Sequence, residues 1–346
     1  MFMRFTAMAL VFVSCLVGVS AGLSKSEFAL ESTIAFSSSR DNPVLNPFMN
    51  GAGEIYLMNP DGTNVRRLTD NTAADAFPAL SPNGKKIVFD SNRKRAEGEP
   101  INTYDLFVMN IKGDEQRFLI RGSSATWSPD SKNIAFHASA SGLGLPIRPD
   151  PGSATSDSDI FVANVDDLLD GVAGPINLTN NPEAIDDDPD WSPDGRRIVF
   201  TSHPVTDDPI RSNQAEIYVI NVDGTGLTRL TFNAEEERSP SWSPDGERIV
   251  YMCRIGGGTA VTEICDMKAD GSDRRRLTNN TVVDATATFS PDGQQILFHR
   301  TVAPGTPGVQ QLWLMNADGT GQIQLTNPPG VNTLANWGVV RVHRRN

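Results

Sequence analysis

A five-residue phrase of the form aromatic-Ser-Pro-Asp-Gly recurs along this chain and constrains its fold more than any other feature. Full copies begin at Trp191, Trp242 and Phe289, and variants begin at Leu80, Trp127 and Trp337. Successive copies are spaced by roughly 50 residues, a period typical of architectures in which each repeat is one supersecondary unit packed on its neighbours. The repeat therefore predicts the fold, and the fold limits which functions can be claimed.

Each repeat contains four expected strands in the same order. The phrase ends a first strand and opens a tight Asp-Gly turn into a second one, such as Arg197 to Thr201. A variable loop leads to a third strand of the form acid-apolar-aromatic-apolar-apolar-Asn, such as Glu216 to Asn221. A second Asp-Gly turn leads to a fourth strand that ends on Leu-Thr, as at Leu230-Thr231. Four such strands make one antiparallel blade, so we expect an all-β, six-bladed β-propeller.

The two ends of the repeat region indicate how the ring closes. Thr33 to Ser38 matches a second strand with no first strand before it, and Ala335 to Trp337 matches a first strand with no second strand after it. Pairing these two segments completes the sixth blade and leaves no blade half-built. We therefore expect one propeller domain over residues 34–346, closed by the N-terminal strand beside the C-terminal strand.

Residues 1–21 have the pattern of a cleaved signal peptide, and residues 22–33 are expected to be a linker. Arg4 precedes an apolar stretch, and Val19-Ser20-Ala21 offers small residues for cleavage. Cys15 is a poor match to a lipoprotein acylation site, so we expect a periplasmic or secreted protein without a membrane-spanning segment. The formal net charge is −12. This acidic balance argues against nucleic-acid binding.

The repeated phrase, the Asn-Val-Asp-Gly turn at Asn221 to Gly224 and the Leu-Thr strand together resemble the WD40-like PD40 repeat of the TolB β-propeller family. The resemblance covers nearly all of residues 34–340. Members of that family also carry a separate α/β domain before the propeller, whereas about a dozen residues stand here between leader and first strand. The resemblance therefore implies the TolB propeller domain alone, and a protein or peptide partner associated with the cell envelope.

The long loops and the blade-to-blade connections are expected on one face of the ring, opposite the short Asp-Gly turns. The variable loops are Ser39 to Gly53, Ser91 to Thr103, Ala138 to Ser158, Ser202 to Gln214 and Arg300 to Val309. Length variation gathered on one face of a rigid scaffold is typical of a binding surface. Five residues before the first residue of each phrase, at the expected mouth of the channel, stand Asp75, Gly122, Asp186, Glu237, Asp284 and Asn332.

Two interpretations of these acidic residues stay open. A repeated Asp can cap the backbone of its own connection, which we favour, or its side chain can meet a partner at the channel mouth. The surplus carboxylates of two neighbouring connections could form a Ca²⁺ site, because Ca²⁺ takes six to eight oxygen ligands, or a solvated acidic rim. The candidate ligands are Asp186, Asp187, Asp188, Asp190, Glu235, Glu236 and Glu237.

No constellation of a known enzyme class is recognised in the sequence. It has no Gly-x-Ser-x-Gly elbow, no His-Glu-x-x-His helix and no phosphate-binding Gly-rich loop. His137 and His299 occupy the same position of the second strand in two blades, which suggests packing variants. We therefore expect a monomeric, non-catalytic interaction scaffold for a protein or peptide. The alternative is a propeller enzyme acting on a sugar or lactone, with a cation at the channel mouth.

Two cysteines remain after the expected leader. Cys253 ends the second strand of one blade and Cys265 lies in its third strand, where another blade carries Ser202 and Tyr218. If the turn centres near Thr259, the two positions face each other. An exported chain with cysteines so placed is expected to form a disulfide, although a slip of one residue would turn the side chains to opposite faces.

Overall fold

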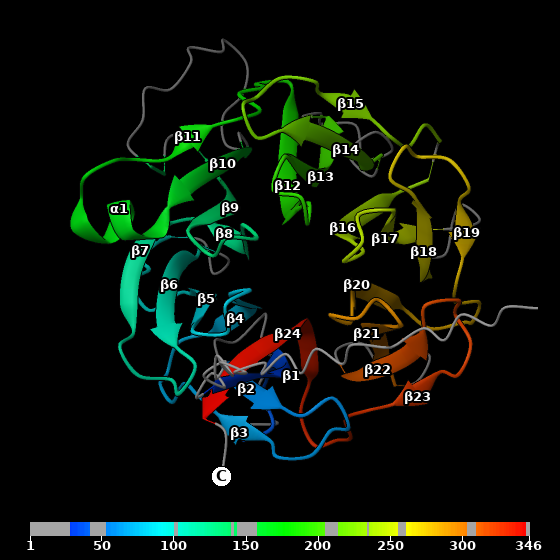
Figure 1. The fold of residues 1–346 in the computed structure, drawn as a ribbon, viewed down its shortest axis with the longest axis horizontal. Helices are drawn as coiled ribbons and strands as arrows, with labels where there is room; N and C mark the ends of the chain where they lie inside the picture. The colour runs from blue at the N-terminus through cyan, green and yellow to red at the C-terminus, as the bar shows by residue number, and fades with distance from the viewer. Residues whose placement is uncertain are drawn as a thin grey trace, which may run out of the picture.

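The computed structural model of this protein describes residues 28–41, 53–99, 103–139, 142–143, 158–204, 214–233, 235–254, 261–302 and 309–343. Six four-stranded antiparallel sheets stand around a central axis as the blades of a ring (Figure 1). The predicted six-bladed propeller is therefore confirmed. No helix among the described residues is long and apolar enough to cross a membrane. The expected signal peptide lies outside these residues, as do most of the variable loops.

Each blade has four strands, numbered below in order from the channel outward. The strands of blades 1 to 3 are β24 (Asn332–His343), β1 (Phe28–Ser38), β2 (Glu54–Met58), β3 (Arg66–Arg67); β4 (Asp75–Leu80), β5 (Lys86–Ser91), β6 (Asp105–Asn110), β7 (Arg117–Arg121); and β8 (Ser123–Trp127), β9 (Asn133–Ala138), β10 (Asp159–Asn164), β11 (Ile176–Asn177). Those of blades 4 to 6 are β12 (Ala184–Trp191), β13 (Arg197–Pro204), β14 (Glu216–Asn221), β15 (Thr228–Arg229); β16 (Glu237–Trp242), β17 (Arg248–Arg254), β18 (Thr262–Lys268), β19 (Arg275–Arg276); and β20 (Asp284–Phe289), β21 (Gln295–Thr301), β22 (Gln310–Asn316), β23 (Ile323–Gln324).

The repeated phrase forms the turn between the first and second strand of a blade. In blade 4 the Ser192 hydroxyl donates to Asp194 Oδ1 at 2.6 Å and accepts from the Arg197 amide at 2.9 Å. The Gly195 amide donates to the Ser192 carbonyl, and Gly195 has a φ of +72°, which residues with a Cβ rarely adopt. The Ser, Asp and Gly of the phrase are thus each required by one hairpin turn.

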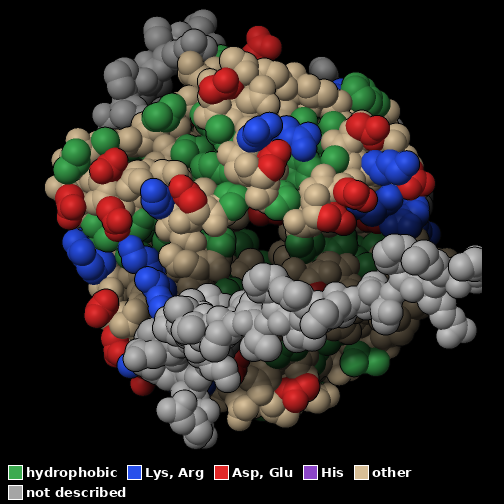
Figure 2. Space-filling view, in the orientation of Figure 1, with side chains coloured by type: hydrophobic (Ala, Val, Ile, Leu, Met, Phe, Trp, Pro, Cys, Tyr) green, Lys and Arg blue, Asp and Glu red, His purple; other side chains and the backbone are tan. Residues whose placement is uncertain are grey.

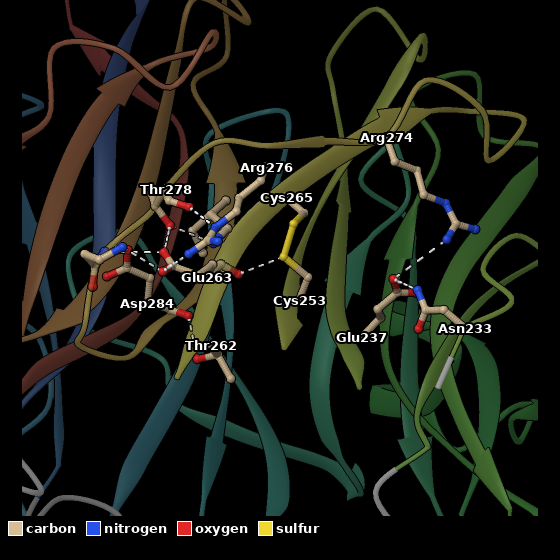
Figure 3. The surroundings of a disulfide bond; sticks show 12 residues. Asn233, Glu237, Cys253, Thr262, Glu263, Cys265, Arg274, Arg276, Thr278 and Asp284 are labelled. Atoms are coloured by element: carbon tan, nitrogen blue, oxygen red, sulfur yellow. Dashed lines mark hydrogen bonds and ion pairs between the residues drawn. A yellow bond between two sulfur atoms is a disulfide. The ribbon is translucent and has the colours of Figure 1, made fainter. Parts of the chain in front are cut away.

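The Leu-Thr pair follows the outer strand, and its threonine bonds a buried acid near the start of the third strand. In blade 5 the Glu263 carboxylate accepts from Thr278 Oγ1 at 2.5 Å, from Arg276 Nη2 at 2.6 Å and from the Asn280 amide at 2.7 Å (Figure 3). Thr278 Oγ1 also accepts from the Ile264 amide. This network holds the two-residue outer strand to the blade, which explains why an acid opens most of the third strands.

The hydrophobic core is divided among the interfaces between neighbouring blades. In one cluster Ile160 and Leu178 of blade 3 pack with Trp191, Ile198 and Phe200 of blade 4. The aromatic residue of the phrase also joins blades by a polar contact, because the indole Nε1 of Trp127 donates to the Ala79 carbonyl of blade 2 at 3.0 Å. Each blade buries its faces only against its neighbours, so the ring is stable only as a whole.

Closure of the ring follows the prediction, with one correction. Strand β1 pairs with β24, and Ile34 lies opposite Trp337. Strand β1 already begins at Phe28, where the sequence suggested a linker over residues 22–33. Residues 28–33 pair with residues 338–343 as a two-stranded ribbon, and the Trp337 indole donates to Ser32 Oγ at 2.8 Å. The linker expectation was wrong for these residues because they form ladder hydrogen bonds rather than a free connection.

Blade 3 departs from the repeat between its third and fourth strands. Instead of an Asp-Gly turn it has a short helix, α1 (Val165–Asp170), where no helix was expected. Asn164 Oδ1 accepts from the amides of Asp166 and Asp167, and Gly171 ends the helix at a φ of +66°. Six residues are too few to leave a helical period in the sequence.

Candidate functional site at the central channel

The six strands that line the channel share a bulge, three residues before the first residue of the repeated phrase. The bulge residue takes a φ between +47° and +53° in every blade, and the ladder to the neighbouring strand shifts register there. The bulge residues are Phe77, Ser124, Asp188, Ser239, Thr286 and Leu334. A non-glycine residue in the left-handed region costs roughly 1–2 kcal/mol. Its recurrence in every blade shows that the bulge belongs to the architecture of the ring.

The second strand of the preceding blade holds several of these bulges in place. The buried Asp90 carboxylate accepts from the Ser124 amide and the Ser123 hydroxyl, and Thr201 Oγ1 accepts from the Ser239 amide at 3.0 Å. Burial raises the pKa of Asp90 to about 8. At the same position of blade 6, His299 Nδ1 lies 2.9 Å from Thr333 Oγ1, and burial lowers the pKa of His299 to about 4. His299 is thus a neutral residue of a blade interface.

A cavity of about 270 Å³ lies at the centre of the ring and is lined by three residues from each blade. Figure 2 shows this face hollowed at the middle. The lining is uneven, because among the described residues its carboxylates come only from β12, as Asp188 and Asp190. Strand β24, which contributes Leu334 and Ala335, lies across the channel from β12 (Figure 1), and neighbouring β4 contributes Phe77. The channel is therefore acidic beside β12, and its largest apolar side chains, Phe77 and Leu334, come from the strands on the other side.

The two channel carboxylates have neutral partners. Asp188 Oδ2 accepts from Ser239 Oγ at 2.8 Å, while Asp190 accepts from the Trp242 amide at 2.7 Å and from Thr126 Oγ1 at 3.0 Å. Burial raises the pKa of both carboxyls above the usual range of Asp, and the neighbouring charge of Asp187 raises that of Asp188 further. A cationic group entering the channel would relieve this cost and be held beside β12.

The residues predicted at the channel mouth do not line this cavity. Each of the five polar ones is at most 3% exposed and lies two residues before the bulge residue of its strand. Their side chains bond within the ring: Asp75 to Arg93, Asp284 to Arg300, Asn332 to Arg40 and Glu237 to Asn233. None of Asp75, Asp186, Glu237, Asp284 and Asn332 therefore faces the central cavity, where the sequence suggested the channel mouth. Gly122 has no side chain, since a Cβ there would lie 2.6 Å from the Phe136 ring.

The proposed Ca²⁺ ligands do not converge on one point. Among the described residues, no group of three His, Cys, Asp or Glu side chains is arranged to hold a metal ion. Asp187 lies 3.6 Å from His203 and 3.7 Å from Arg238, and Glu236 pairs with Arg238 and Arg254. Consecutive strand residues point to opposite faces, so a run of acids along β12 distributes its carboxylates instead of gathering them. Asp186 and Glu237 are buried as described above, and Asp190 faces the channel.

Cys253 of β17 and Cys265 of β18 are joined by a disulfide in the structure, with Cα atoms 5.9 Å apart (Figure 3). The register differs from the expected one. Cys253 lies opposite Glu263 and Cys265 opposite Tyr251, so the two cysteines are diagonal neighbours rather than a direct pair. A shift of two residues keeps both side chains on one face of the sheet, which is why the bond still forms.

Comparison with known proteins places these features in a family. The model of the TolB β-propeller domain, PD40, matches residues 152–341, more than half of the chain. An uncharacterized protein of Agrobacterium fabrum, Atu1656, is 29% identical over 126 residues, 36% of this chain and 34% of that protein. The uncharacterized peptidase YuxL of Bacillus subtilis is 24% identical over 153 residues, 44% of this chain and 20% of the peptidase. The chain thus spans about a third or less of these relatives.

The fold comparison agrees with the family model. The crystal structure of TolB from Acinetobacter baumannii superposes with a TM-score of 0.66 at 18% identity, covering 89% of this chain and 66% of that one. At this identity the likeness concerns the fold. Together with the family model and the repeated blades, it shows that the chain belongs to the TolB β-propeller family.

Proposed function

We propose that this protein is an exported, non-catalytic scaffold that binds a peptide segment of a protein partner in its central channel. The observation that supports this most strongly is the two-sided lining of the central cavity. Asp188 and Asp190 stand on one side, and Leu334, Ala335 and Phe77 stand on the other. A segment that carries a basic side chain next to an apolar one fits both sides at once.

Two further observations support the same proposal. The scaffold is rigid, because each blade packs only on its neighbours and β1 and β24 close the ring. A rigid site avoids much of the ordering cost of binding. The disulfide between Cys253 and Cys265 suits an oxidising compartment, as expected for a chain with an export leader.

Peptide display on immobilised protein tests the channel. We expect selected peptides to carry Lys or Arg beside an apolar residue and to lose at least tenfold in affinity on Asp188→Asn, because a neutral amide no longer attracts the cation. Ala335→Trp should block binding by filling the apolar side. Asp170→Asn on exposed α1 is the matched control and should leave affinity unchanged. Peptides that bind equally well to both channel variants would place the binding surface elsewhere.

Metal analysis separates this proposal from an enzyme that uses a cation at the channel. Protein purified without added metal is expected to carry no stoichiometric divalent ion by mass spectrometry. An ion that stays bound in the wild type and is lost on Asp188→Asn would favour the alternative, a propeller enzyme acting on a sugar or lactone.

A further inference from the structure

In three blades an arginine is bound by the polar residue that begins the channel strand, which is Asp75, Asp284 or Asn332. In blade 2, Arg93 Nη2 donates to both oxygens of Asp75 at 3.0 and 2.8 Å, and its Nε donates to Ser91 Oγ at 2.8 Å. The guanidinium lies over the rings of Phe89 and Phe107, 5.4 and 4.6 Å from their centroids. A carboxylate, a serine and two stacked rings thus hold one guanidinium.

Blades 6 and 1 hold their own arginines in the same way with one part changed. In blade 6 the arginine itself stands at the position of the serine, and in blade 1 Asn332 stands in place of the acid. Arg300 donates to Asp284 through Nε at 2.6 Å and Nη2 at 2.7 Å, and it lies over Phe298 and Trp313. In blade 1, Arg40 donates to Asn332 at 2.9 Å and to Ser38 at 3.2 Å, over Phe36 and Tyr56. Arg40 and Arg93 each stand two residues after the serine.

The described residues of blade 4 supply every part of this arrangement except the arginine. Asp186 lies opposite Ser202 in the ladder, as Asp75 lies opposite Ser91. Phe200 and Tyr218 stack with centroids 6.0 Å apart, close to the 5.9 Å of Phe89 and Phe107. Two residues after Ser202 the chain has Pro204, which has no guanidinium.

A cavity of about 330 Å³ lies in this place and is lined by Asp186, Ser202, Phe200, Tyr218 and Glu216 among others. Asp186 is 2% exposed, and its Oδ1 has no hydrogen-bond partner among the described residues. Oε2 of the buried Glu216, which lines the same cavity, also lacks one. Leaving a buried acceptor without a donor costs about 1–3 kcal/mol, so the cavity favours a ligand that donates.

We infer that this cavity, the blade-4 pocket, binds the guanidinium group of an arginine side chain supplied by a partner polypeptide. A guanidinium would donate to Asp186 and Ser202 and lie over Phe200 and Tyr218, as Arg93 does in blade 2. Among the described residues, the groups around the pocket that titrate or carry charge are the carboxyls of Asp186, Asp187, Asp159, Glu183 and Glu216, together with Tyr218, His203, and Arg229, which already pairs with Glu216. The carboxyls outnumber the cations, so the pocket attracts positive charge.

The inference goes beyond the proposed function and does not depend on it. The blade-4 pocket begins at the first residue of β12, whereas the channel is lined from its bulge residue onward. Variants of Asp188 test the channel, and variants of Asp186 test this pocket. Among the described residues, blade 5 offers no second copy. Arg274 Nη1 already lies 3.9 Å from Glu237, and the disulfide puts Cys253 in the place of Ser202 and Cys265 in the place of Tyr218.

The test uses N-acetyl-arginine amide and methylguanidinium as probes, followed by saturation-transfer NMR and thermal shift at pH 7.5. We expect both probes to bind the wild type, and N-acetyl-lysine amide to bind at least tenfold more weakly, because an ammonium lacks the planar fork that stacks on rings. Asp186→Asn should weaken probe binding at least tenfold. Asp170→Asn is the surface control.

Two further variants keep the test decisive. Pro204→Arg places an arginine where blades 1 and 2 have one, and we expect it to abolish probe binding while the protein stays folded. Arg300→Ala empties the arrangement of blade 6 and should create a second site for the probes. Probe binding that is unaffected by both Asp186→Asn and Pro204→Arg would overturn the inference. Binding that appears only after Arg211→Ala would also overturn it, since the chain would then fill its own pocket.

Discussion

At the scale of single residues, the buried acids of this propeller differ in whether a guanidinium faces them. Asp75 and Asp284 each bond an arginine, whereas Asp186 has Ser202 and Thr179 as neutral partners. Burial raises the pKa of Asp186 to about 6, and the charges of Asp159 and Asp187 add to the shift. The carboxylate at this position of the repeat thus stabilises blades 2 and 6, whereas in blade 4 its burial lowers the stability of the folded ring.

This contrast predicts a pH-dependent effect of Asp186→Asn. A carboxyl whose folded pKa is above its unfolded value contributes a cost that is absent below about pH 4 and complete above about pH 6. We expect Asp186→Asn to raise the free energy of unfolding at pH 7.5 by up to about 2–3 kcal/mol, with the gain vanishing near pH 4. Urea unfolding at both pH values measures it.

The matched control for that prediction is Asp284→Asn. It removes a carboxylate that pairs with Arg300 in the same repeat position, and breaking one partner of a buried pair costs about 3–5 kcal/mol. The two Asp→Asn changes should therefore have opposite signs at pH 7.5. Loss of stability in both variants would show that Asp186 carries no cost in the folded ring.

At the scale of elements, the sequence predicts a feature only where that feature requires a particular type of residue. The strands and turns were predictable, because a hairpin such as that at Gly195 requires a particular residue at a particular place. The channel bulges were not, because Phe, Ser, Asp, Thr and Leu all occupy the bulge position. Because the bulge was not expected, the sequence placed Asp186 at the channel. The residues of this strand that line the channel are Asp188 and Asp190.

The bulge predicts that a residue better suited to a positive φ will stabilise the ring. Thr286 is β-branched and has a φ of +48°, a genuine outlier for such a residue. We expect Thr286→Asn to raise the free energy of unfolding by about 0.5–1 kcal/mol, because Asn tolerates this region. Thr288→Asn is the control, since Thr288 lines the same cavity without a positive φ. Equal effects of the two changes in urea unfolding would argue against backbone strain.

The disulfide between β17 and β18 gives a second prediction at this scale. It spans a sequence separation of 12, for which the chain-entropy estimate gives about 2–3 kcal/mol. We expect the double variant Cys253→Ser, Cys265→Ser to lose about that free energy of unfolding. Wild type in reducing agent should match the double variant, and the reducing agent should leave that variant unchanged. Mass spectrometry of the non-reduced protein measures the bond directly, and two freely alkylated thiols would contradict it.

At the scale of the whole molecule, stability depends on one closure. Blade 1 combines strands from both ends of the described chain. Its channel strand, β24, is the last strand, whereas β1, β2 and β3 are the first three. Its ribbon continues past Trp337 and reaches blade 2, where the Arg341 amide donates to the Gly84 carbonyl at 2.9 Å and Val340 packs with Leu80 and Ile87. Strand β24 therefore completes blade 1 and also connects it to blade 2.

Two truncations separate these roles. A chain that ends after Leu334 loses Trp337 and most of the channel strand of blade 1, and we expect its cooperative thermal unfolding to be lost, because the faces of blades 1 and 2 and the edge of β1 become exposed. A chain that ends after Gly338 loses the part of the ribbon that pairs with residues 28–32, so it should keep one cooperative transition at a lower Tm. Calorimetry of the two chains beside the wild type measures the difference. An unchanged Tm for the shorter chain would contradict closure by β24, since the ring would then hold together without the strand that completes blade 1.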